Sequence, residues 1–367
     1  MVKPIIGIDG SRLSRAEKTG TETYSDAIVH GLVRSETARW RLYVDREPDR
    51  SRWPAGVDIR KITAPRLWTH VRLSLEMAAH APHLLFIPAH VIPLVHPRAI
   101  VTIHDLGYLQ LPDHHSARQH RLLDITTRWS ARAAAAIIVP SNVTRLDLIN
   151  RYGTSPDKIR VVHHGVDDRF RHVLSEERAR VKEAYGLDRP YLLAVGTIHP
   201  RKNLPTLARA AARLIASGRD LDLVLVGRNG WMADEVHQQI RGIGLGNRLK
   251  PLAYVPSHDL PGLYAGAACF VQPSLFEGFG MPVVEAMAAG APVVCARSSA
   301  LPEIAGDGAV FFDPLDDQEL ATIIQRILSD DEHRGLLVAR GWARSKAFSW
   351  SRCIGDTVTI LHETLDG

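Results

Sequence analysis

The chain has 367 residues, of which 45% are hydrophobic and 23% charged, and Lys and Arg exceed Asp and Glu by 45 − 40 = 5. This length favours two domains, and this composition is ordinary for a globular protein, which excludes a disordered or fibrous chain. No run approaches the ~18 apolar residues of a membrane span. The modest positive charge fits a solvated surface, or attraction to a phosphate-rich ligand or an anionic membrane face. We expect no nucleic-acid partner.

Cysteine usage indicates a reducing compartment. Cys269, Cys295 and Cys353 are far apart in the sequence. The first two lie in apolar runs, so we predict buried small side chains rather than disulfides or metal ligands. The apolar run of the N-terminal MVKPIIGIDG is too short for a signal peptide. These features together predict a cytoplasmic location.

Short apolar runs alternate with helical patterns along the whole chain, which is typical of βαβ units and parallel sheets. In the first half we expect strands at 3–9, 40–44, 57–62, 83–88, 99–104 and 135–140, and helices at 21–35, 69–80, 116–133 and 142–151. Ser141 precedes the last of these helices and is its predicted N-cap.

The pattern changes near residue 165, where 161–187 is polar and charged and predicts a connection between two domains. A second series has expected strands at 191–196, 222–227, 248–255, 269–274, 292–296 and 309–313, and helices at 204–217, 231–242, 258–265, 282–289, 316–329 and over most of 331–367. Pro205 and Pro282 stand near helix starts, and Gly218 and Gly290 stand just past helix ends. Two doubly wound domains would bind ligands beyond the carboxyl ends of their strands.

The most informative segment is SLFEGFGMPVVEAMAAG at 274–290. Gly278 and Gly280 allow a tight backbone path at a helix start, which favours a phosphate or a hydroxyl-rich group. Glu277 lies in the loop and Glu285 in the first helical turn, so one carboxylate can reach a sugar and the other a ribose diol. The alternative is that both glutamates only support the helix N-terminus.

A second segment, AVGTIHPRKNL at 194–204, follows a strand and precedes a helix. Gly196 makes the turn, and Arg201 and Lys202 present two cations that suit a diphosphate. Asn203 is placed to cap the next helix. The alternative is a solvated basic turn.

Two weaker segments belong to the first half. His104 and Asp105 end a strand and could orient a hydroxyl or accept a proton. In the stretch Lys18–Tyr24, Gly20 would let backbone N–H groups approach a phosphate, although the pattern is neither GxGxxG nor a P-loop. The remaining histidines have no metal-ligand spacing, so no metal site is predicted.

Together these segments resemble glycosyltransferase family 4, whose members have the GT-B fold and a retaining mechanism. EGFGMPVVE matches the E-x7-E signature of the family, and VGTIHPRKNL matches its Arg-Lys donor loop. The stretches SNVTRLDLINRYGTSPDKIRVVHHGVD, LPEIAGDGAVFFDP and FSW also follow in the family's order. His163-His164 departs from it, because a Pro-Asn or similar pair is more usual there.

The resemblance implies a role for each matching residue. Arg201 and Lys202 would bind the donor diphosphate, Glu277 would lie at the donor sugar, and the carboxylate of Glu285 would bind the ribose. The implied donor-binding set is Gly20, Gly196, Arg201, Lys202, Tyr254, Val255, Glu277, Gly278, Phe279, Gly280, Met281, Val284 and Glu285. The implied catalytic set is Glu277, His104, Arg201 and Lys202, with His104 and Asp105 on the acceptor side. Tyr254-Val255 would touch the base.

The resemblance also implies the architecture and the chemistry. An α/β GT-B chain would have Rossmann-like domains at 1–170 and 171–346 facing across a cleft, and 347–367 would form a helix crossing back to the first. Cationic side chains and a helix terminus would replace a metal, and no cofactor is expected beside the nucleotide-sugar co-substrate. Front-face attack, with the leaving phosphate accepting the acceptor's proton, would explain why no catalytic base stands out.

The expected function is transfer of a hexose to a glycan or lipid-linked glycan in bacterial surface polysaccharide synthesis, with mannose from GDP-mannose favoured. Rhamnose or another deoxysugar, or glucose, from a GDP-, dTDP- or UDP-sugar is the alternative. A GT-B epimerase, a glycogen-type phosphorylase and a non-catalytic nucleotide-sugar sensor are further alternatives. The stretch 65–86 is spaced like an amphipathic surface helix. It predicts either a core-facing helix or peripheral contact with the inner face of the cytoplasmic membrane.

Overall fold

The computed structural model describes residues 3–14, 19–63, 68–110 and 117–366. It divides the chain into two compact units, one formed by Met1–Leu109, Ser116–Gly165 and Trp350–Gly367, and the other mainly by Val166–Ser349. The chain therefore leaves the first unit after Gly165 and returns to it at Trp350. The sequence analysis placed these two changes at residues 171 and 347.

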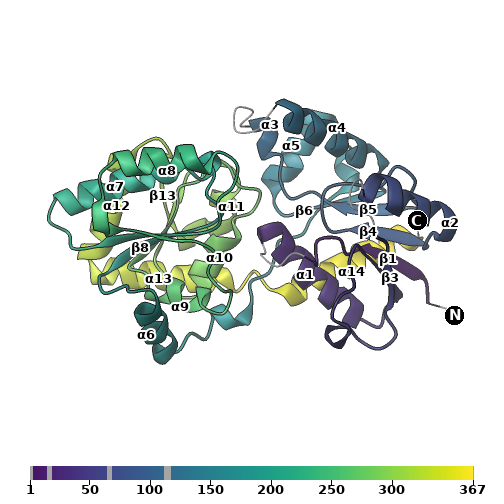
Figure 1. Ribbon diagram of the computed structural model, residues 1–367, viewed down its shortest axis with the longest axis horizontal. Coiled ribbons are helices and arrows are strands. Elements are labelled where there is room, and N and C mark those ends of the chain that lie inside the picture. The colour runs from purple at the N-terminus through teal and green to yellow at the C-terminus, as the bar shows by residue number, and fades with distance from the viewer. Residues whose placement is uncertain (1–2, 15–18, 64–67, 111–116, 367) are drawn as a thin grey trace. The chain divides into compact units, whose positions relative to one another are not determined.

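The first unit is built on a parallel sheet with the strand order β3-β2-β1-β4-β5-β6-β7 (Figure 1). The strands are β1 (Ile5–Asp9), β2 (Arg39–Val44), β3 (Asp58–Lys61), β4 (Leu84–Ile87), β5 (Ala99–Thr102), β6 (Ala136–Val139) and β7 (Ile159–Val161). The helices are α1 (Gly20–Arg34), α2 (Ser74–His80), α3 (Gly107–Gln110), α4 (Ala117–Ala133), α5 (Asn142–Tyr152) and α14 (Trp350–Asp366), and a π-helical stretch, Trp68–Leu73, precedes α2.

Apolar residues on both faces of this sheet build two cores. Side chains alternate along a strand, so Leu84 and Phe86 of β4 pack with α1 and α14, while Leu85 and Ile87 pack with α2, α4 and α5. Fully buried strands of this kind read as continuous apolar runs rather than as alternating ones. This explains why LLFI and AIIV were recognisable in the sequence.

The last helix, α14, packs on α1 and reaches β4 and β6 of the first unit. The close contact depends on Gly31 of α1, since a Cβ placed there would lie 2.1 Å from Cδ1 of Ile354. Cys353, Ile360 and Leu361 are buried in this contact. The final helix, in which Ile354 lies 354 − 31 = 323 positions after Gly31, therefore completes one core of the first unit.

The stretch considered for membrane contact, 65–86, packs one side of its helix on the core. Residues 65–67 lie outside the described residues. Leu73 and Met77 are buried, and the indole N–H of Trp68 donates to the carbonyl of Ile62 at 2.7 Å. Only two large apolar side chains of its helix, Val71 and Leu75, are exposed. One side of this helix therefore faces the core, and the other side is exposed.

The second unit has a parallel sheet with the order β10-β9-β8-β11-β12-β13. The strands are β8 (Tyr191–Val195), β9 (Asp222–Val226), β10 (Leu249–Leu252), β11 (Cys269–Gln272), β12 (Val293–Ala296) and β13 (Val310–Phe312). The helices are α6 (Ser175–Ala184), α7 (Leu204–Ala216), α8 (Ala233–Gly242), α9 (Leu260–Gly266), α10 (Met281–Ala288), α11 (Leu301–Ala305), α12 (Asp317–Ser329) and α13 (Asp331–Ser345). Figure 1 shows α7, α8 and α12 on one face of this sheet and α9, α10 and α13 on the other.

Most expected elements and their end signals are confirmed. Each expected strand is present within a few residues of its predicted bounds. Ser141 caps α5, because its hydroxyl accepts from the backbone N–H of Thr144 at 3.2 Å. Gly218 and Gly290 follow helices with φ of +93° and +79°. Cys269 and Cys295 are buried free thiols, as predicted, and Cys353 is one as well.

The interpretation of 161–187 as a connection is wrong in part. It overlaps the end of β7, an edge strand, and contains α6, which packs on α9 in the second unit. Val181 is the one side chain of α6 that is buried, and it sits so close to Gly262 that a Cβ there would be 2.8 Å from Val181 Cγ2. A helix held by a single apolar contact has almost no periodic signal, so the sequence pattern missed it.

Candidate active site

The strand order of the second sheet reverses between β8 and β11. These two strands are neighbours in the sheet although they are far apart in sequence. Parallel doubly wound sheets bind ligands at such a switch point, beyond the carboxyl ends of the two strands. Both sequence segments singled out above begin at this point: Gly196 follows β8, and Ser274 follows β11. A backbone hydrogen bond from Leu275 N–H to the carbonyl of Arg201, 2.9 Å long, joins the two loops.

Glycine is required where the chain leaves β8. Gly196 has a φ of +149° and Gly227, after the adjacent β9, has a φ of +150°. A Cβ on Gly227 would lie 1.9 Å from the carbonyl oxygen of Gly196, so only glycine lets the two turns pass each other. A Cβ on Gly196 would lie 3.3 Å from Cε of Lys202. The Gly196 turn therefore leaves room for the lysine side chain.

Arg201, Lys202 and Glu277 form a cation–carboxylate cluster at this point. Nζ of Lys202 lies 2.5 Å from Glu277 Oε1, and an Nη of Arg201 lies 2.9 Å from Oε2. The same Arg201 nitrogen donates to the carbonyl of Phe276 at 2.5 Å. The Glu277 side chain is 9% exposed, and those of Arg201 and Lys202 are 23% and 12% exposed. The cluster is therefore largely shielded from water.

The charge state of the cluster follows from these contacts. Burial alone would raise the pKa of Glu277, but Lys202 and then Arg201 outweigh it and lower that pKa to about 2. The carboxylate is thus ionised at neutral pH. Counting these three side chains, two cations and one anion give 2 − 1 = +1. A net positive charge in a low-dielectric setting favours binding of an anionic group such as a phosphate.

Polar residues that the sequence analysis did not single out hold Glu277 in place. The Ser274 hydroxyl donates to Oε1 at 2.7 Å, and the Gln272 amide donates to the same oxygen at 2.9 Å. The backbone N–H of Glu277 donates to the Ser299 hydroxyl at 2.7 Å. Gln272 and Ser274 are fully or almost fully buried. The position of the Glu277 carboxylate depends on the folded loop. The sequence therefore has no periodic pattern that would indicate its hydrogen bonds with Gln272 and Ser274.

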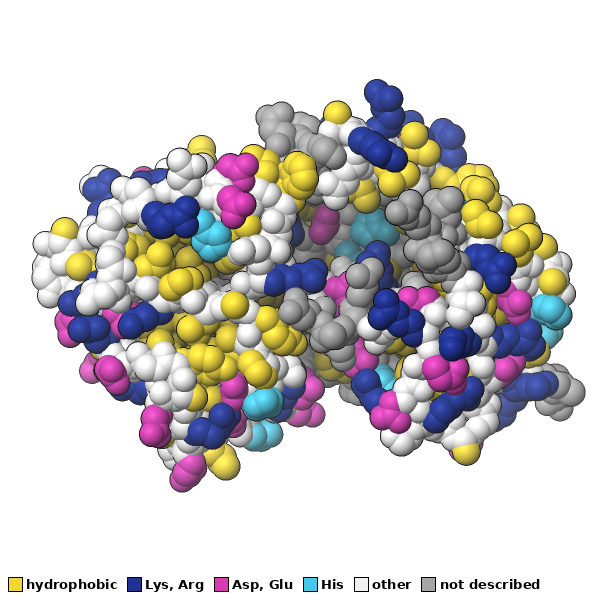
Figure 2. All heavy atoms as spheres, in the orientation of Figure 1, with side chains coloured by type: hydrophobic (Ala, Val, Ile, Leu, Met, Phe, Trp, Pro, Cys, Tyr) yellow, Lys and Arg dark blue, Asp and Glu magenta, His cyan; other side chains and the backbone are white. Residues whose placement is uncertain are grey.

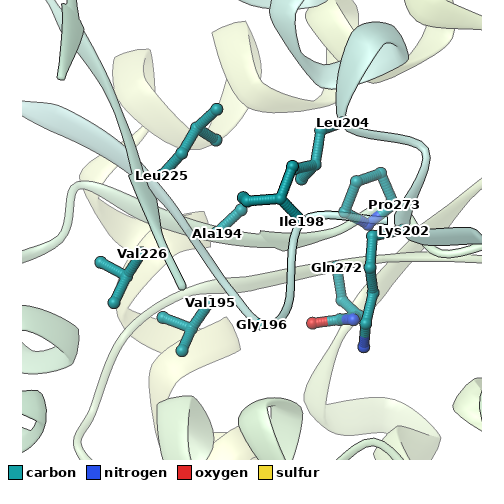
Figure 3. A pocket seen from close by; sticks show the side chains of 10 residues that line it. All are labelled: Ala194, Val195, Gly196, Ile198, Lys202, Leu204, Leu225, Val226, Gln272 and Pro273. Carbon is teal, nitrogen blue, oxygen red and sulfur yellow. The ribbon is translucent and has the colours of Figure 1, made fainter. Parts of the chain in front are cut away.

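Figure 3 shows Lys202 and Gln272 extending side by side in the same direction from a small pocket at the end of β8. The rest of the pocket lining is mostly apolar and comprises Ala194, Val195, Gly196, Ile198, Leu204, Leu225, Val226 and Pro273. Packing of the lysine stem against these side chains orients its ammonium group. The cation is therefore positioned before any ligand arrives.

Asn203 differs from its predicted role. It occupies the N-cap position of α7 with φ of +52°, but its side chain makes no capping hydrogen bond to that helix. Its amide donates instead to the carbonyls of Pro273, at 3.1 Å, and Pro314, at 2.7 Å. Asn tolerates this left-handed conformation better than most residues. Asn203 thereby ties the Arg-Lys turn to the loop that follows β11.

Glu285 lies beside α9 rather than in the first turn of α10. It is the fifth residue of that helix, so it belongs to the second turn. The Tyr264 hydroxyl donates to its Oε2 at 2.9 Å. Burial outweighs this hydrogen bond and raises the pKa of Glu285. Gly280 is the N-cap residue before α10, with φ of +97°, and a Cβ there would lie 2.9 Å from a methyl group of Leu301, so the tight path expected at this glycine is present.

Several residues of the implied donor-binding set contribute core packing through their side chains. Phe279 is 5% exposed and stands edge-on to Phe348, with ring centroids 5.6 Å apart. Val255 and Val284 are also buried. Tyr254 is the exception, because 42% of it is exposed. At the buried positions only backbone groups remain for a ligand.

His104 is enclosed within the first unit. Its Nε2 lies 2.9 Å from the carbonyl oxygen of Pro88, and its Nδ1 lies 3.4 Å from Nε2 of His164. The ring also packs edge-on against Tyr24. Burial, and then the neighbouring His90, lower its pKa to about 4, so the ring is neutral at neutral pH. This geometry suits a structural histidine at least as well as an acceptor-side one.

Asp105 and Gly20 occupy turn and helix-end positions. Oδ1 of Asp105 accepts from the backbone N–H of Gly107 at 2.9 Å. Gly20 is the exposed first residue of α1, and Thr19 and Glu22 form a capping box around it. This T-x-x-E signal was readable in the sequence and was missed. Lys18 of the same stretch lies outside the described residues.

Metal-ligand clusters and membrane spans were both sought in the described ranges. No group of three His, Cys, Asp or Glu side chains in these ranges is arranged to hold a metal ion. No helix there combines the length and the apolar character that crossing a bilayer requires.

Comparison with known proteins agrees with the fold. Residues 175–341 match the family model described as Glycosyl transferases group 1, and residues 22–170 match Glycosyltransferase Family 4. O-antigen chain mannosyltransferase B of Escherichia coli is 31% identical over 309 residues, which cover 84% of this chain and 80% of the relative. MMP alpha-(1->4)-mannosyltransferase of Mycolicibacterium hassiacum is 30% identical over 243 residues, covering 64% of this chain and 56% of the relative.

Solved structures show the same two-unit fold at low sequence identity. The crystal structure of Anabaena Alr3699/HepE in complex with UDP-glucose has a TM-score of 0.79 at 20% identity, covering 98% of this chain and 100% of that one. That of WaaG, a glycosyltransferase involved in lipopolysaccharide biosynthesis, has a TM-score of 0.79 at 16% identity, covering 97% and 99%. The protein is thus a glycosyltransferase of the GT-B class. Within that class, the chain belongs to glycosyltransferase family 4.

Proposed function

We propose that this glycosyltransferase moves mannose from GDP-mannose to a glycan or lipid-linked glycan acceptor in surface polysaccharide synthesis, at the cytoplasmic face of the membrane. The observation that carries a nucleotide-sugar donor is the Arg201–Glu277–Lys202 cluster at the switch point between β8 and β11. The choice of mannose is supported by the printed names of relatives, among them the Escherichia coli O-antigen mannosyltransferase at 31% identity.

In the proposed reaction the cluster binds the donor and stabilises its departure. Arg201 and Lys202 hold the diphosphate and balance the negative charge that grows on it as the bond between sugar C1 and phosphate oxygen breaks. Glu277, ionised and fixed by Gln272 and Ser274, accepts hydrogen bonds from sugar hydroxyls. Glu285, next to Tyr264, accepts from the ribose.

The acceptor attacks C1 from the face that the phosphate leaves, so the anomeric configuration is retained. The acceptor's hydroxyl proton moves to an oxygen of the departing phosphate, which means that no separate protein base is required. The positive charge that a metal would otherwise supply comes from Arg201 and Lys202. We therefore propose a metal-independent reaction without any cofactor beside the nucleotide-sugar.

A donor screen tests this proposal. Thermal shift with GDP-, UDP- and dTDP-sugars identifies the bound donor, and nucleotide release is then measured with and without a glycan acceptor. We expect stabilisation by GDP-mannose, acceptor-dependent release of GDP, and the same rate in excess EDTA. Binding of UDP-glucose instead would contradict the choice of mannose and support a glucosyltransferase. Release that needs no acceptor would favour an epimerase, and binding without turnover would favour a sensor.

A further inference from the structure

Helix α4 of the first unit exposes an unusual face. Its exposed side chains, apart from Ala117 and Gln119, are Arg118, Arg121, Leu122, Ile125, Arg128, Trp129 and Arg132. These positions follow a helical spacing of three and four, so they form one stripe. Leu122, Ile125 and Trp129 are 60%, 58% and 36% exposed. The opposite side of α4, with Thr126, Thr127, Ser130 and Ala131, packs into the unit.

Neighbouring segments extend this apolar surface. The indole N–H of Trp129 donates to the carbonyl of Ile92 at 3.2 Å, and the Ser74 hydroxyl accepts from the N–H of Val95 at 3.3 Å. The loop from Ile92 to Val95 therefore joins α4 to α2. Its exposed members, Leu94 and Val95, are 58% and 49% exposed, and Leu75 of α2 is 58% exposed. We call this surface the α4 patch. It consists of the four exposed arginines of α4 together with Leu75, Leu94, Val95, Leu122, Ile125 and Trp129.

The charge of the α4 patch is one-sided. Asp124, the one carboxylate of α4, is partly exposed; it accepts from the Tyr152 hydroxyl at 2.8 Å and its other oxygen lies 3.6 Å from an Nη of Arg128. Four exposed arginines thus share a single carboxylate on their helix, and the charge of the α4 patch stays positive. Figure 2 shows the corresponding mixture of yellow and dark blue side chains along the upper edge of the first unit, where Figure 1 places α4.

Large apolar side chains interleaved with arginines are suited to binding at the surface of an anionic bilayer. Apolar tips can enter the boundary between headgroups and acyl chains while guanidinium groups bind anionic headgroups, and a Trp at that depth is favoured. A symmetric contact with a second copy would bring two rows of arginines face to face, which Coulomb repulsion opposes. An anionic partner surface therefore fits better than self-association.

We propose that the α4 patch docks the first unit onto an anionic lipid bilayer. The proposal goes beyond sugar transfer and is independent of the donor. It places the contact mainly on α4 and the 92–95 loop, and the helix within 65–86 contributes Leu75 alone. A docked first unit would hold the enzyme at the surface that carries a lipid-linked acceptor.

Vesicle co-sedimentation without any substrate tests the proposal. The full chain should bind vesicles of equal parts phosphatidylglycerol and phosphatidylcholine, and should bind pure phosphatidylcholine vesicles much more weakly. Arg118→Glu with Arg121→Glu should lower binding by about 30-fold or more, since each arginine near an anionic surface contributes about fivefold. Leu122→Gln with Ile125→Gln should lower it by about tenfold.

Matched variants in the second unit show whether a loss of vesicle binding is specific to the α4 patch or follows from any similar change of surface residues. Leu315→Gln with Leu336→Gln removes two side chains that are 78% and 52% exposed, and Arg241→Glu with Arg340→Glu reverses two exposed charges. Both control pairs should bind vesicles like the unmodified chain, and unfolding temperatures should show that all variants fold. Two outcomes would overturn the proposal: wild-type protein that ignores anionic vesicles, or α4 variants that bind as well as the controls. If the wild type ignores vesicles and the Leu122/Ile125 variant disrupts a dimer in light scattering, the patch is a self-association surface.

Discussion

At the residue scale, Glu277 and the two cations depend on one another. A buried carboxylate without cations would be protonated, and buried cations without a carboxylate would repel each other. Gln272 and Ser274 add hydrogen bonds to the same Oε1 that Lys202 contacts. The three charged side chains are therefore positioned before any ligand arrives, and preorganised charge of this kind can lower a reaction barrier.

Lys202→Ala should lower kcat/KM by about 100-fold or more, because it removes one charged donor from a site that is shielded from water. Glu277→Ala should lower it similarly through lost contacts to the sugar. Steady-state nucleotide release measures both. Lys182→Ala and Glu183→Ala, which alter exposed residues of α6, are the controls. Full activity in Lys202→Ala and Glu277→Ala would show that the reacting sugar binds elsewhere.

Glu277 should also make stability depend on pH. Its folded pKa of about 2 lies below its ordinary value of 4.5, so its ionisation stabilises the fold fully above about pH 4.5 and loses that effect as pH falls toward 2. At neutral pH this effect is at most roughly 3 kcal/mol. The stability gap between wild type and Glu277→Gln, measured by urea unfolding, should therefore shrink from pH 6 to pH 3. Glu183→Gln should show no such gap, and a constant gap for Glu277→Gln would contradict the assignment.

At the element scale, two glycines decide how neighbouring segments meet. Gly227 lets the turns after β8 and β9 pass each other. Gly31 lets α14 lie close to α1. In both cases the partner is far along the chain, and the contact leaves no space for a methyl group.

Gly31→Ala should destabilise the protein by about 1–3 kcal/mol, because the new methyl group would overlap Ile354 and force that side chain out of place. Thermal and urea unfolding measure the loss. Gly355→Ala, on the same helix α14 as Ile354, is the matched control, since a Cβ there meets nothing within 4 Å. It should be neutral or stabilising by about 0.5–1 kcal/mol, as expected of Ala at an exposed helix position. Equal effects of the two changes would mean that α14 does not pack on α1 in this way.

At the scale of the whole molecule, the last helix of the chain, α14, packs as part of the first unit. Deleting residues 350–367 should expose the core that Cys353, Ile360 and Leu361 share with β4 and α1, and so unfold the first unit while leaving the second intact. Hydrogen exchange should then show lost protection in β1 and β4, with protection in β8 and β11 unchanged. If both sheets lose protection together, the two units do not fold separately.

The sequence predicted the α/β class, the two sheets and most of their strands, because buried parallel strands appear as short apolar runs between helical periods. It missed β7 and α6, where one or two apolar contacts leave no periodic pattern. Of the proposed site, the glycines and the residues Arg201, Lys202 and Glu277 were recognisable because turn chemistry and charge type are local properties.

The sequence by itself determined the element order, the family and the identities of the charged residues, since these depend on local pattern and motif. Tertiary structure alone decided which of them meet. It joined Glu277 to Lys202 across 75 positions, recruited Gln272 and Ser274, and enclosed His104 between Pro88 and His164. It also placed Asp124 between Tyr152 and Arg128 while leaving the arginines of α4 exposed. Burial and pairing between distant segments set charge and accessibility, and neither can be read from residues adjacent in sequence.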